Sequence, residues 1–273
     1  MHPRLPSADF LDLIRPSTGE IFDAQPAARG FSSDVLTLID SDLGRFFVKG
    51  IKNRAGGRRD SLLRERIINP SVHPLSPRLC WHAQNDQWIA LGFEQLNGRP
   101  SNFAPNSPDL PAIMQLVNRI GEIPLPAAAE LWPETRWDRF ASDPHEAALF
   151  KGDSLIHGDI NPGNLLIGDT GSWVVDWAWP TRGSALIDPA LLALQLIAAG
   201  HSPQDAETWT SQCTAWTHSD PAAIDAFARA NLRMYRKRAK RYPDQTWLAA
   251  METTARAWTD YRQASSPSAR ANT

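Results

Sequence analysis

One short stretch constrains this 273-residue chain more than any other. Residues 157–164 read HGDINPGN, and Asp176 follows twelve residues after Asn164. The apolar runs LLI and WVV lie between them and are separated by GDTG, which predicts a hairpin of two short strands. The hairpin would carry two carboxylates, Asp159 and Asp176, and one carboxamide, Asn164. Such oxygen groups suit proton transfer and the binding of a hard metal ion.

The spacing of these residues is that of a phosphoryl-transfer site. An Asp followed five residues later by Asn, with a second Asp after the next strand, is the order found in a kinase catalytic loop. We therefore expect Asp159 to take a proton from a substrate hydroxyl, and Asn164 and Asp176 to bind Mg²⁺. The alternatives are an Asx-type turn at Asp159 and Asn161, a strand-end cap at Asn164 and a turn at Asp176. His157 is interpreted as a structural residue of the loop.

The same residues resemble the aminoglycoside phosphotransferase-like family of small-molecule kinases. In that family the catalytic loop reads HGD, four residues, then N, and the metal-binding Asp begins an Asp-Trp step such as Asp176-Trp177. The match is strong over residues 155–190 and weaker over 28–98, and beyond 200 only a helical pattern is visible. The resemblance implies an α+β, two-lobed protein-kinase-like fold.

The resemblance also implies a different role for each of the two lobes. A small antiparallel sheet with one helix, residues 1–95, would form the nucleotide-binding lobe. A larger and mainly helical lobe, residues 96–273, would bind the substrate and carry out catalysis. The cofactors would be ATP, or another nucleoside triphosphate, and Mg²⁺. The partner would be a small-molecule hydroxyl acceptor of the antibiotic, amino alcohol, sugar or nucleoside type.

Local patterns in the first hundred residues fit such a lobe. Apolar, strand-like runs at 35–39, 45–49 and 88–93 predict three strands. Residues 61–67 predict a short helix, which we expect to stop before Pro70, because the residue before proline avoids the helical region. The order is that of a kinase N-terminal lobe.

A lysine and a glutamate in this lobe are candidates for the phosphate site. Lys49 lies at the end of the second predicted strand and would contact the α- and β-phosphates, and Glu65 on the following helix would orient it. Lys52 is a competitor, but we place it in a basic loop. The alternatives are a solvated strand end for Lys49 and an exposed helix charge for Glu65.

The phosphate loop and the adenine connector are weaker candidates. The loop around Gly30 has one glycine where a glycine fingerprint has three, so Ser32 and Ser33 would have to contribute their hydroxyl and backbone groups. An ordinary turn is the alternative. Glu94 and Leu96 would present backbone groups to the adenine ring.

The second lobe is predicted to be mostly helical. The pair Asp188-Pro189 reads best as an N-cap followed by proline at the first helical position, with a clamp on the catalytic loop as the other interpretation. The helix that follows is almost wholly apolar and should be buried. The expected helices are 110–120, 144–150, 190–199 and two or three more over 203–263.

Composition and charge exclude several classes of function. A net charge of −2 gives no reason to expect a nucleic-acid partner, and no apolar run is long enough for a membrane span. The two cysteines, Cys80 and Cys213, have no metal spacing, and the N-terminal residues lack a signal sequence. We therefore expect a cytoplasmic monomer or homodimer.

The acceptor is less constrained than the reaction. From residue 201 onward there are ten Lys or Arg and seven Asp or Glu, an excess of positive charge that argues against a polycationic aminoglycoside. A catalytically inactive, kinase-like protein that binds a nucleotide or small ligand is the alternative function, motivated by the loop with one glycine. A metallophosphoesterase is disfavoured, because the histidines form no supporting cluster.

Overall fold

The computed structural model describes residues 6–27 and 33–265, which form two compact units. The first unit comprises the chain up to Gly98 together with Trp173–Trp179, and the second comprises Arg99–Ser172 and the chain from Pro180 onward. The expected lobe boundary at residue 95 falls just before the end of the first stretch. The return of 173–179 to the first unit was not expected.

The first unit is built on a five-stranded antiparallel sheet with the strand order β1-β2-β3-β5-β4. The predicted strands are present and longer than expected, whereas α1, β1 and β4 had no prediction. The elements of the unit are α1 (Ala8–Thr18), β1 (Ile21–Pro26), β2 (Val35–Ser41), β3 (Gly44–Lys52), α2 (Gly57–Val72), β4 (Leu79–Gln84) and β5 (Trp88–Glu94).

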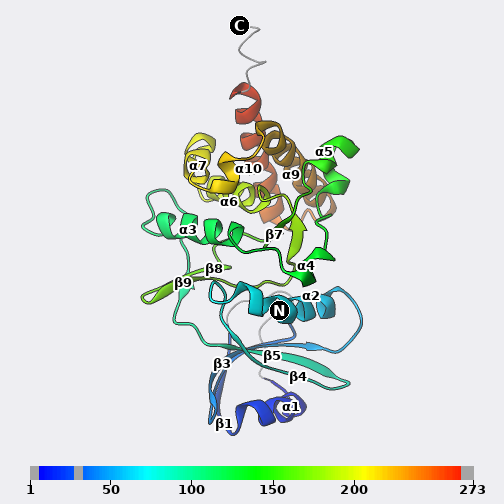
Figure 1. Ribbon diagram of the computed structural model, residues 1–273, viewed down its shortest axis with the longest axis vertical. Coiled ribbons are helices and arrows are strands. Elements are labelled where there is room, and N and C mark those ends of the chain that lie inside the picture. Colours follow the sequence, from blue (N-terminus) through cyan, green and yellow to red (C-terminus); the bar gives the residue numbers. More distant parts are fainter. Residues whose placement is uncertain (1–5, 28–32, 266–273) are drawn as a thin grey trace. The chain divides into compact units, whose positions relative to one another are not determined.

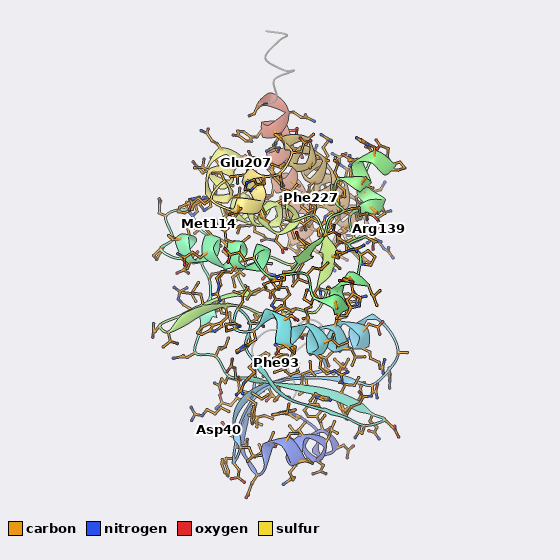
Figure 2. The ribbon with its side chains drawn as sticks, viewed as in Figure 1. Asp40, Phe93, Met114, Arg139, Glu207 and Phe227 are labelled. Atoms are coloured by element: carbon orange, nitrogen blue, oxygen red, sulfur yellow. The ribbon has the colours of Figure 1, made fainter. Side chains whose placement is uncertain are left out.

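Both faces of this sheet are covered, α1 on one and α2 on the other (Figure 1). Strand β5 is buried almost throughout, and its side chains alternate between the two faces. Trp88 and Ala90 pack with Phe10 of α1, whereas Leu91 and Phe93 pack with Leu62 of α2. Figure 2 labels Phe93 on the α2 side. A polar side chain on that face of the sheet is therefore brought against α2.

Helix α2 is longer than the sequence predicted. It continues through Pro70 to Val72, so the expectation that it stops before the proline was wrong. The side chain of Asn69 donates to the carbonyl of Pro77 at 2.8 Å and accepts the N–H of Leu79 at 2.8 Å. These bonds attach the last turn of α2 to the start of β4 and support a helical conformation that the local sequence disfavours.

The second unit contains short strands and most of the helices (Figure 1). Strands β7 (Ser154–Ile156) and β10 (Thr181–Gly183) pair antiparallel. Strand β6 (Arg99–Pro100) pairs with β8 (Leu165–Gly168), and the next strand, β9 (Gly171–Val174), runs from the second unit into the first. The chain therefore leaves the second unit within the predicted catalytic hairpin, at its second strand.

Helix α6 (Ile187–Ala198) is almost wholly apolar and buried, as expected, and it packs against the four helices that follow it in the chain. Phe227 of α9 packs against Trp137 and Phe150 in the same core (Figure 2). The other helical elements of the second unit are α3 (Leu110–Gly121), α4 (Ala127–Glu130), the 3-10 turn η1 (Asp138–Phe140), α5 (Pro144–Ala148), α7 (Pro203–Thr210), α8 (Thr214–Thr217), α9 (Pro221–Arg241) and α10 (Thr246–Ser265). Among the described residues, no helix is long and apolar enough to cross a membrane.

Candidate functional site

Strand β3 places Lys49 in the interior of the first unit. The strand runs to Lys52, so Lys49 is a central strand residue and not the strand end that was expected. Since Phe47, Lys49 and Ile51 alternate with Val48, Lys49 shares the α2 face of the sheet with Ile51. The side chain is 9% exposed. The Nζ of Lys52 lies 3.7 Å from the centroid of the Trp88 ring. Lys49 is thus the lysine that pairs with Glu65.

Lys49 bridges two carboxylates. Its Nζ lies 2.8 Å from Oε1 of Glu65 on α2 and 2.7 Å from Oδ1 of Asp176. Burial alone would lower the pKa of Lys49, but the carboxylates of Asp176 and Glu65 outweigh burial and raise the pKa above its ordinary value. The ammonium group therefore stays charged, and three residues predicted from separate parts of the sequence meet in one buried ion-pair group.

Asp176 reaches Lys49 because the segment 173–179 belongs to the first unit. The N–H of Val174 donates to the carbonyl of Leu75 at 2.9 Å, and Val174 and Trp177 are buried. Asp176 has a φ of 65°, in the left-handed region that few residues other than glycine adopt. Such a conformation is stabilised only where the surroundings determine it, and it occurs often at functional sites.

A pocket in the first unit opens beside this ion-pair group. Its lining includes Ser33, Lys49, Arg58, Glu65 and Asp176. Ser33 therefore lies where the sequence predicted a phosphate contact. Ser32, the other predicted loop residue, falls outside the described residues. The pocket joins charged and hydroxyl groups from the sheet, from α2 and from the returning segment.

The predicted adenine contacts lie at the end of β5. The carboxylate of Glu94 accepts the N–H of Arg78 at 2.7 Å, so its side chain is occupied by the start of β4. Leu96 lies two residues beyond the end of β5 and is partly buried, and its backbone makes no hydrogen bond to another described residue. The backbone groups of Leu96 are therefore available to a ligand, as the connector hypothesis requires.

The second unit carries the predicted catalytic loop. His157 is buried, and its Nδ1 accepts the N–H of Asp159 at 3.2 Å, while the carboxylate of Asp159 lies at the exposed surface. Nδ2 of Asn164 donates to the backbone carbonyl of Asp159 at 2.9 Å and to its Oδ2 at 3.0 Å. His157 thus holds the loop, as predicted, and Asn164 orients the carboxylate of Asp159.

These contacts fix which way the Asn164 carboxamide faces. Because two oxygens of Asp159 lie against one side of the group, that side must be the NH₂. No described residue donates a hydrogen bond to its Oδ1. An Asn oxygen is a ligand of the kind that hard cations prefer. Asn164 is therefore able to contact Asp159 and a cation with opposite ends of its carboxamide.

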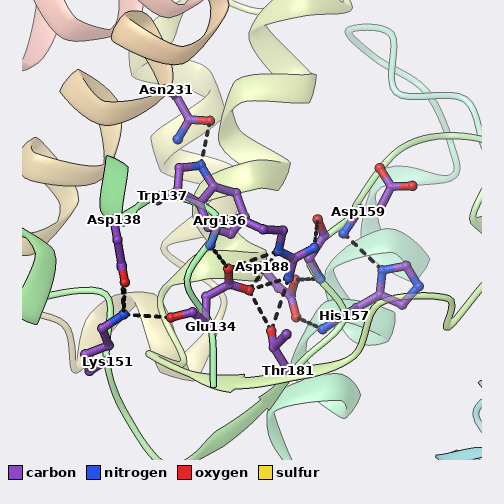
Figure 3. Close-up of polar contacts among 11 residues, drawn as sticks. Glu134, Arg136, Trp137, Asp138, Lys151, His157, Asp159, Thr181, Asp188 and Asn231 are labelled. Atoms are coloured by element: carbon purple, nitrogen blue, oxygen red, sulfur yellow. Dashed lines mark hydrogen bonds and ion pairs between the residues drawn. The ribbon is translucent and has the colours of Figure 1, made fainter. Parts of the chain in front are cut away.

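Asp188 clamps the catalytic loop. Its two carboxylate oxygens accept the N–H groups of His157 at 2.9 Å and of Gly158 at 2.7 Å (Figure 3). Helix α6 begins at Ile187, with Leu186 at the N-cap position, so the preferred interpretation of Asp188 as the cap was wrong. The other interpretation, a clamp on the backbone of the catalytic loop, agrees with these bonds.

A second support of the loop has no counterpart in the sequence prediction. Arg136 donates to the carbonyl of Gly158 at 3.2 Å and pairs with the fully buried carboxylate of Glu134 (Figure 3). The hydroxyl of Thr181 on β10 also donates to Glu134, at 2.6 Å. Gly158 has a φ of 74°, and a Cβ there would lie 2.1 Å from Arg136. Glu134, Arg136 and Thr181 lie in segments without helix or strand periodicity, so the sequence pattern did not single them out. The one usable signal was Gly158, because glycine favours left-handed turns.

The donor set suits Mg²⁺ but is small. Among the described residues, no group of three or more His, Cys, Asp or Glu is placed to hold a metal ion. Mg²⁺ takes one or two protein oxygens and keeps water and phosphate oxygens as its other ligands. The side chains of Asp176 and of Asn164 each carry an oxygen of that kind.

Comparison with solved structures shows that the fold is protein-kinase-like, of the type found in small-molecule phosphotransferases, as predicted. An aminoglycoside phosphotransferase from Alicyclobacillus acidocaldarius superposes with a TM-score of 0.64 at 12% identity, covering 96% of each chain. Choline kinase from Streptococcus pneumoniae gives 0.61 at 12% identity, covering 92% of this chain and 97% of its own.

A third similar structure is a macrolide 2'-phosphotransferase from Brachybacterium faecium. Its TM-score is 0.60 at 15% identity, with 92% of this chain and 98% of the other covered. At the level of sequence the chain matches no family model and no curated protein. The three structures thus establish the fold, while their different names indicate that this fold serves several acceptors.

Proposed function

We propose that this protein transfers the γ-phosphoryl group of ATP, or of another nucleoside triphosphate, to a hydroxyl group of a small molecule. The observation that carries the proposal is the ion-pair group formed by the buried Lys49 and Glu65 with the partly exposed Asp176. A strand lysine held by a helix glutamate, next to an aspartate that binds magnesium, is the arrangement by which kinases position phosphates.

Similar structures support the nucleotide. An aminoglycoside phosphotransferase with a TM-score of 0.59 and 12% identity was determined in a ternary complex with ADP and hygromycin B. The choline kinase was determined in complex with AMP. We infer that the pocket beside Lys49 takes the phosphates, that Ser33 contacts them, and that Glu94 and Leu96 flank the adenine.

The catalytic residues have distinct roles in this proposal. Lys49 binds the α- and β-phosphates, and Glu65 fixes its direction. Asn164 and Asp176 hold Mg²⁺, which neutralises charge on the phosphates when it is bound. Asp159, kept in place by Asn164, positions the acceptor hydroxyl and accepts its proton. Most of the rate enhancement then comes from positioning and from charge neutralisation.

The acceptor is proposed to lie beside helix α9. Burial raises the pKa of Tyr235 on this helix, while the charge of Arg238 opposes the rise and that of Asp159 adds to it. The hydroxyl of Tyr235 therefore stays protonated and can donate a hydrogen bond near the catalytic carboxylate. Arg238 one turn later, exposed and without a carboxylate at ion-pair distance among the described residues, disfavours a polycationic acceptor.

Two measurements test the function. Mg·ATP should raise the melting temperature, because a ligand that binds only the folded state stabilises it. ADP release should then appear with at least one compound in a panel of hydroxylated antibiotics, nucleosides, amino alcohols and sugars. Stabilisation without ADP release from any of them would contradict transfer and favour the alternative, a kinase-like binding protein. Absence of both effects would contradict either function.

A further inference from the structure

Arg58 is a charged residue that neither the sequence motifs nor the proposed roles above include. It lies in the first turn of α2 and lines the pocket that contains Lys49 and Asp176. One of its guanidinium nitrogens is 2.8 Å from Oδ1 of Asp34. The other oxygen of Asp34 accepts the N–H of Lys52 at 2.8 Å. Arg58 is therefore held beside the pocket by a residue at the start of β2.

The side chains of the ion-pair group in this pocket do not balance the negative charge of a polyphosphate. Lys49 carries one positive charge and faces two negative ones, those of Glu65 and Asp176. The side chains of the ion-pair group alone are therefore net negative and, without a bound Mg²⁺, would oppose a triphosphate. Among the described residues that line the pocket, Arg58 is the other positively charged side chain.

The geometry suits a phosphate ligand. A guanidinium group presents several N–H donors in a plane and binds phosphate oxygens in a bidentate manner, with charge-assisted hydrogen bonds. Asp34 and Arg58 are partly exposed, at 33% and 54% of their side-chain areas. An ion pair this exposed adds little stability, and exchange of one anionic partner for another is correspondingly easy.

We propose that Arg58 is a second phosphate-binding residue, which contacts the β- or γ-phosphate of a nucleoside triphosphate, and that Asp34 holds it in position before the nucleotide binds. This inference rests on the proposed function and deepens it.

Nucleotides with different numbers of phosphates provide the test. Affinities of ATP, ADP and AMP are measured in the presence of Mg²⁺ for the wild-type protein and for Arg58→Ala, by calorimetry or by displacement of a fluorescent nucleotide. Loss of a charge-assisted contact should weaken ATP about tenfold, and should weaken ADP equally if the contact is to the β-phosphate but not if it is to the γ-phosphate. AMP, which lacks the β- and γ-phosphates, should bind almost as well as it does to wild type. Arg58→Lys should recover part of the ATP affinity, since it keeps the charge.

Two further variants separate phosphate binding from a structural role. Asp34→Asn breaks the ion pair but keeps the guanidinium, so it should lose much less ATP affinity than Arg58→Ala. Arg45→Ala removes a comparable exposed pair, Arg45 with Asp40 at 3.2 Å, that does not line the pocket. This control should bind all three nucleotides as wild type does.

The outcomes distinguish this inference from the function on which it rests. Equal losses for Arg58→Ala and Asp34→Asn, or an equal loss for AMP and ATP, would overturn the phosphate role of Arg58 while leaving nucleotide binding intact. A wild-type protein that binds none of the three nucleotides would overturn the proposed function itself.

Discussion

Individual charged side chains determine the shape of the catalytic loop. Asp188 accepts the two backbone N–H groups at His157 and Gly158, and Arg136 donates to the carbonyl of Gly158. Burial raises the pKa of Asp188, although His157 and the backbone donors oppose the rise. The motif HGD was readable from the sequence. The clamp by Asp188 was only the less favoured interpretation of that residue, and the support by Arg136 and Glu134 was not predicted.

Glu134 gives this arrangement a measurable pH dependence. Burial alone would raise its pKa, but Arg136 and the hydroxyl of Thr181 outweigh burial and lower the pKa below the ordinary value of 4.5. The ionised carboxylate of Glu134 therefore stabilises the folded protein fully above pH 4.5. This stabilisation is lost as the pH falls through the lower pKa that Glu134 has in the folded protein.

We expect Glu134→Gln to lower the free energy of unfolding at pH 7 by about 2 kcal/mol, since a buried charge-assisted pair is broken. The difference in unfolding free energy between the variant and the wild type should stay constant down to about pH 5 and become smaller at lower pH. Urea unfolding over this range measures it. A gap that widens toward low pH would show that Glu134 is not the group that titrates.

At the scale of elements, packing determined what local sequence could not. The apolar runs that predicted β3 and β5 are nearly continuous because both faces of the sheet are covered. The end of α2 was mispredicted, since the side-chain bonds of Asn69 to the start of β4 outweigh the local effect of Pro70. Helix α1 was missed, although it buries Phe10 completely against the sheet.

The contact between α1 and β3 depends on a glycine. A Cβ at Gly50 would lie 2.3 Å from the ring of Phe10, which also packs edge-on against Trp88. Gly50→Ala should therefore destabilise the protein by about 1–3 kcal/mol through overpacking. Gly121→Ala at the end of α3 is the control, because nothing lies within 4 Å of its added methyl group. Thermal unfolding that ranks the two variants equally would contradict the packing of α1 on β3.

For the whole molecule, the two compact units do not correspond to two successive halves of the sequence. Residues 173–179 lie in the second half of the sequence but belong to the first unit. The sequence predicted the function of Asp176 without predicting this return, because a motif specifies spacing and not which side chains lie nearby. The assignment of lobes as nucleotide-binding and catalytic, the compartment and the monomer-or-homodimer state stay predictions.

Two tryptophans in the returning segment make a matched pair for testing this division. Trp177 is 1% exposed and Trp179 is 43% exposed. Trp177→Ala should lower stability by about 3–5 kcal/mol and increase amide hydrogen exchange in β3 and α2. Trp179→Ala should have a much smaller effect. Increased exchange in α6 alone, with β3 unchanged, would show that the segment belongs to the second unit instead.

The central claim is that Asp159 activates a hydroxyl group for phosphoryl transfer. Its most direct test uses ATP labelled at the γ-phosphate and an acceptor that supports ADP release, with product analysis by mass spectrometry. The wild-type protein and Asp169→Ala, a control in the exposed hairpin turn, should both place the label on the acceptor. Asp159→Ala should bind Mg·ATP normally and form no labelled product. Labelled product at the wild-type rate from Asp159→Ala would contradict the account.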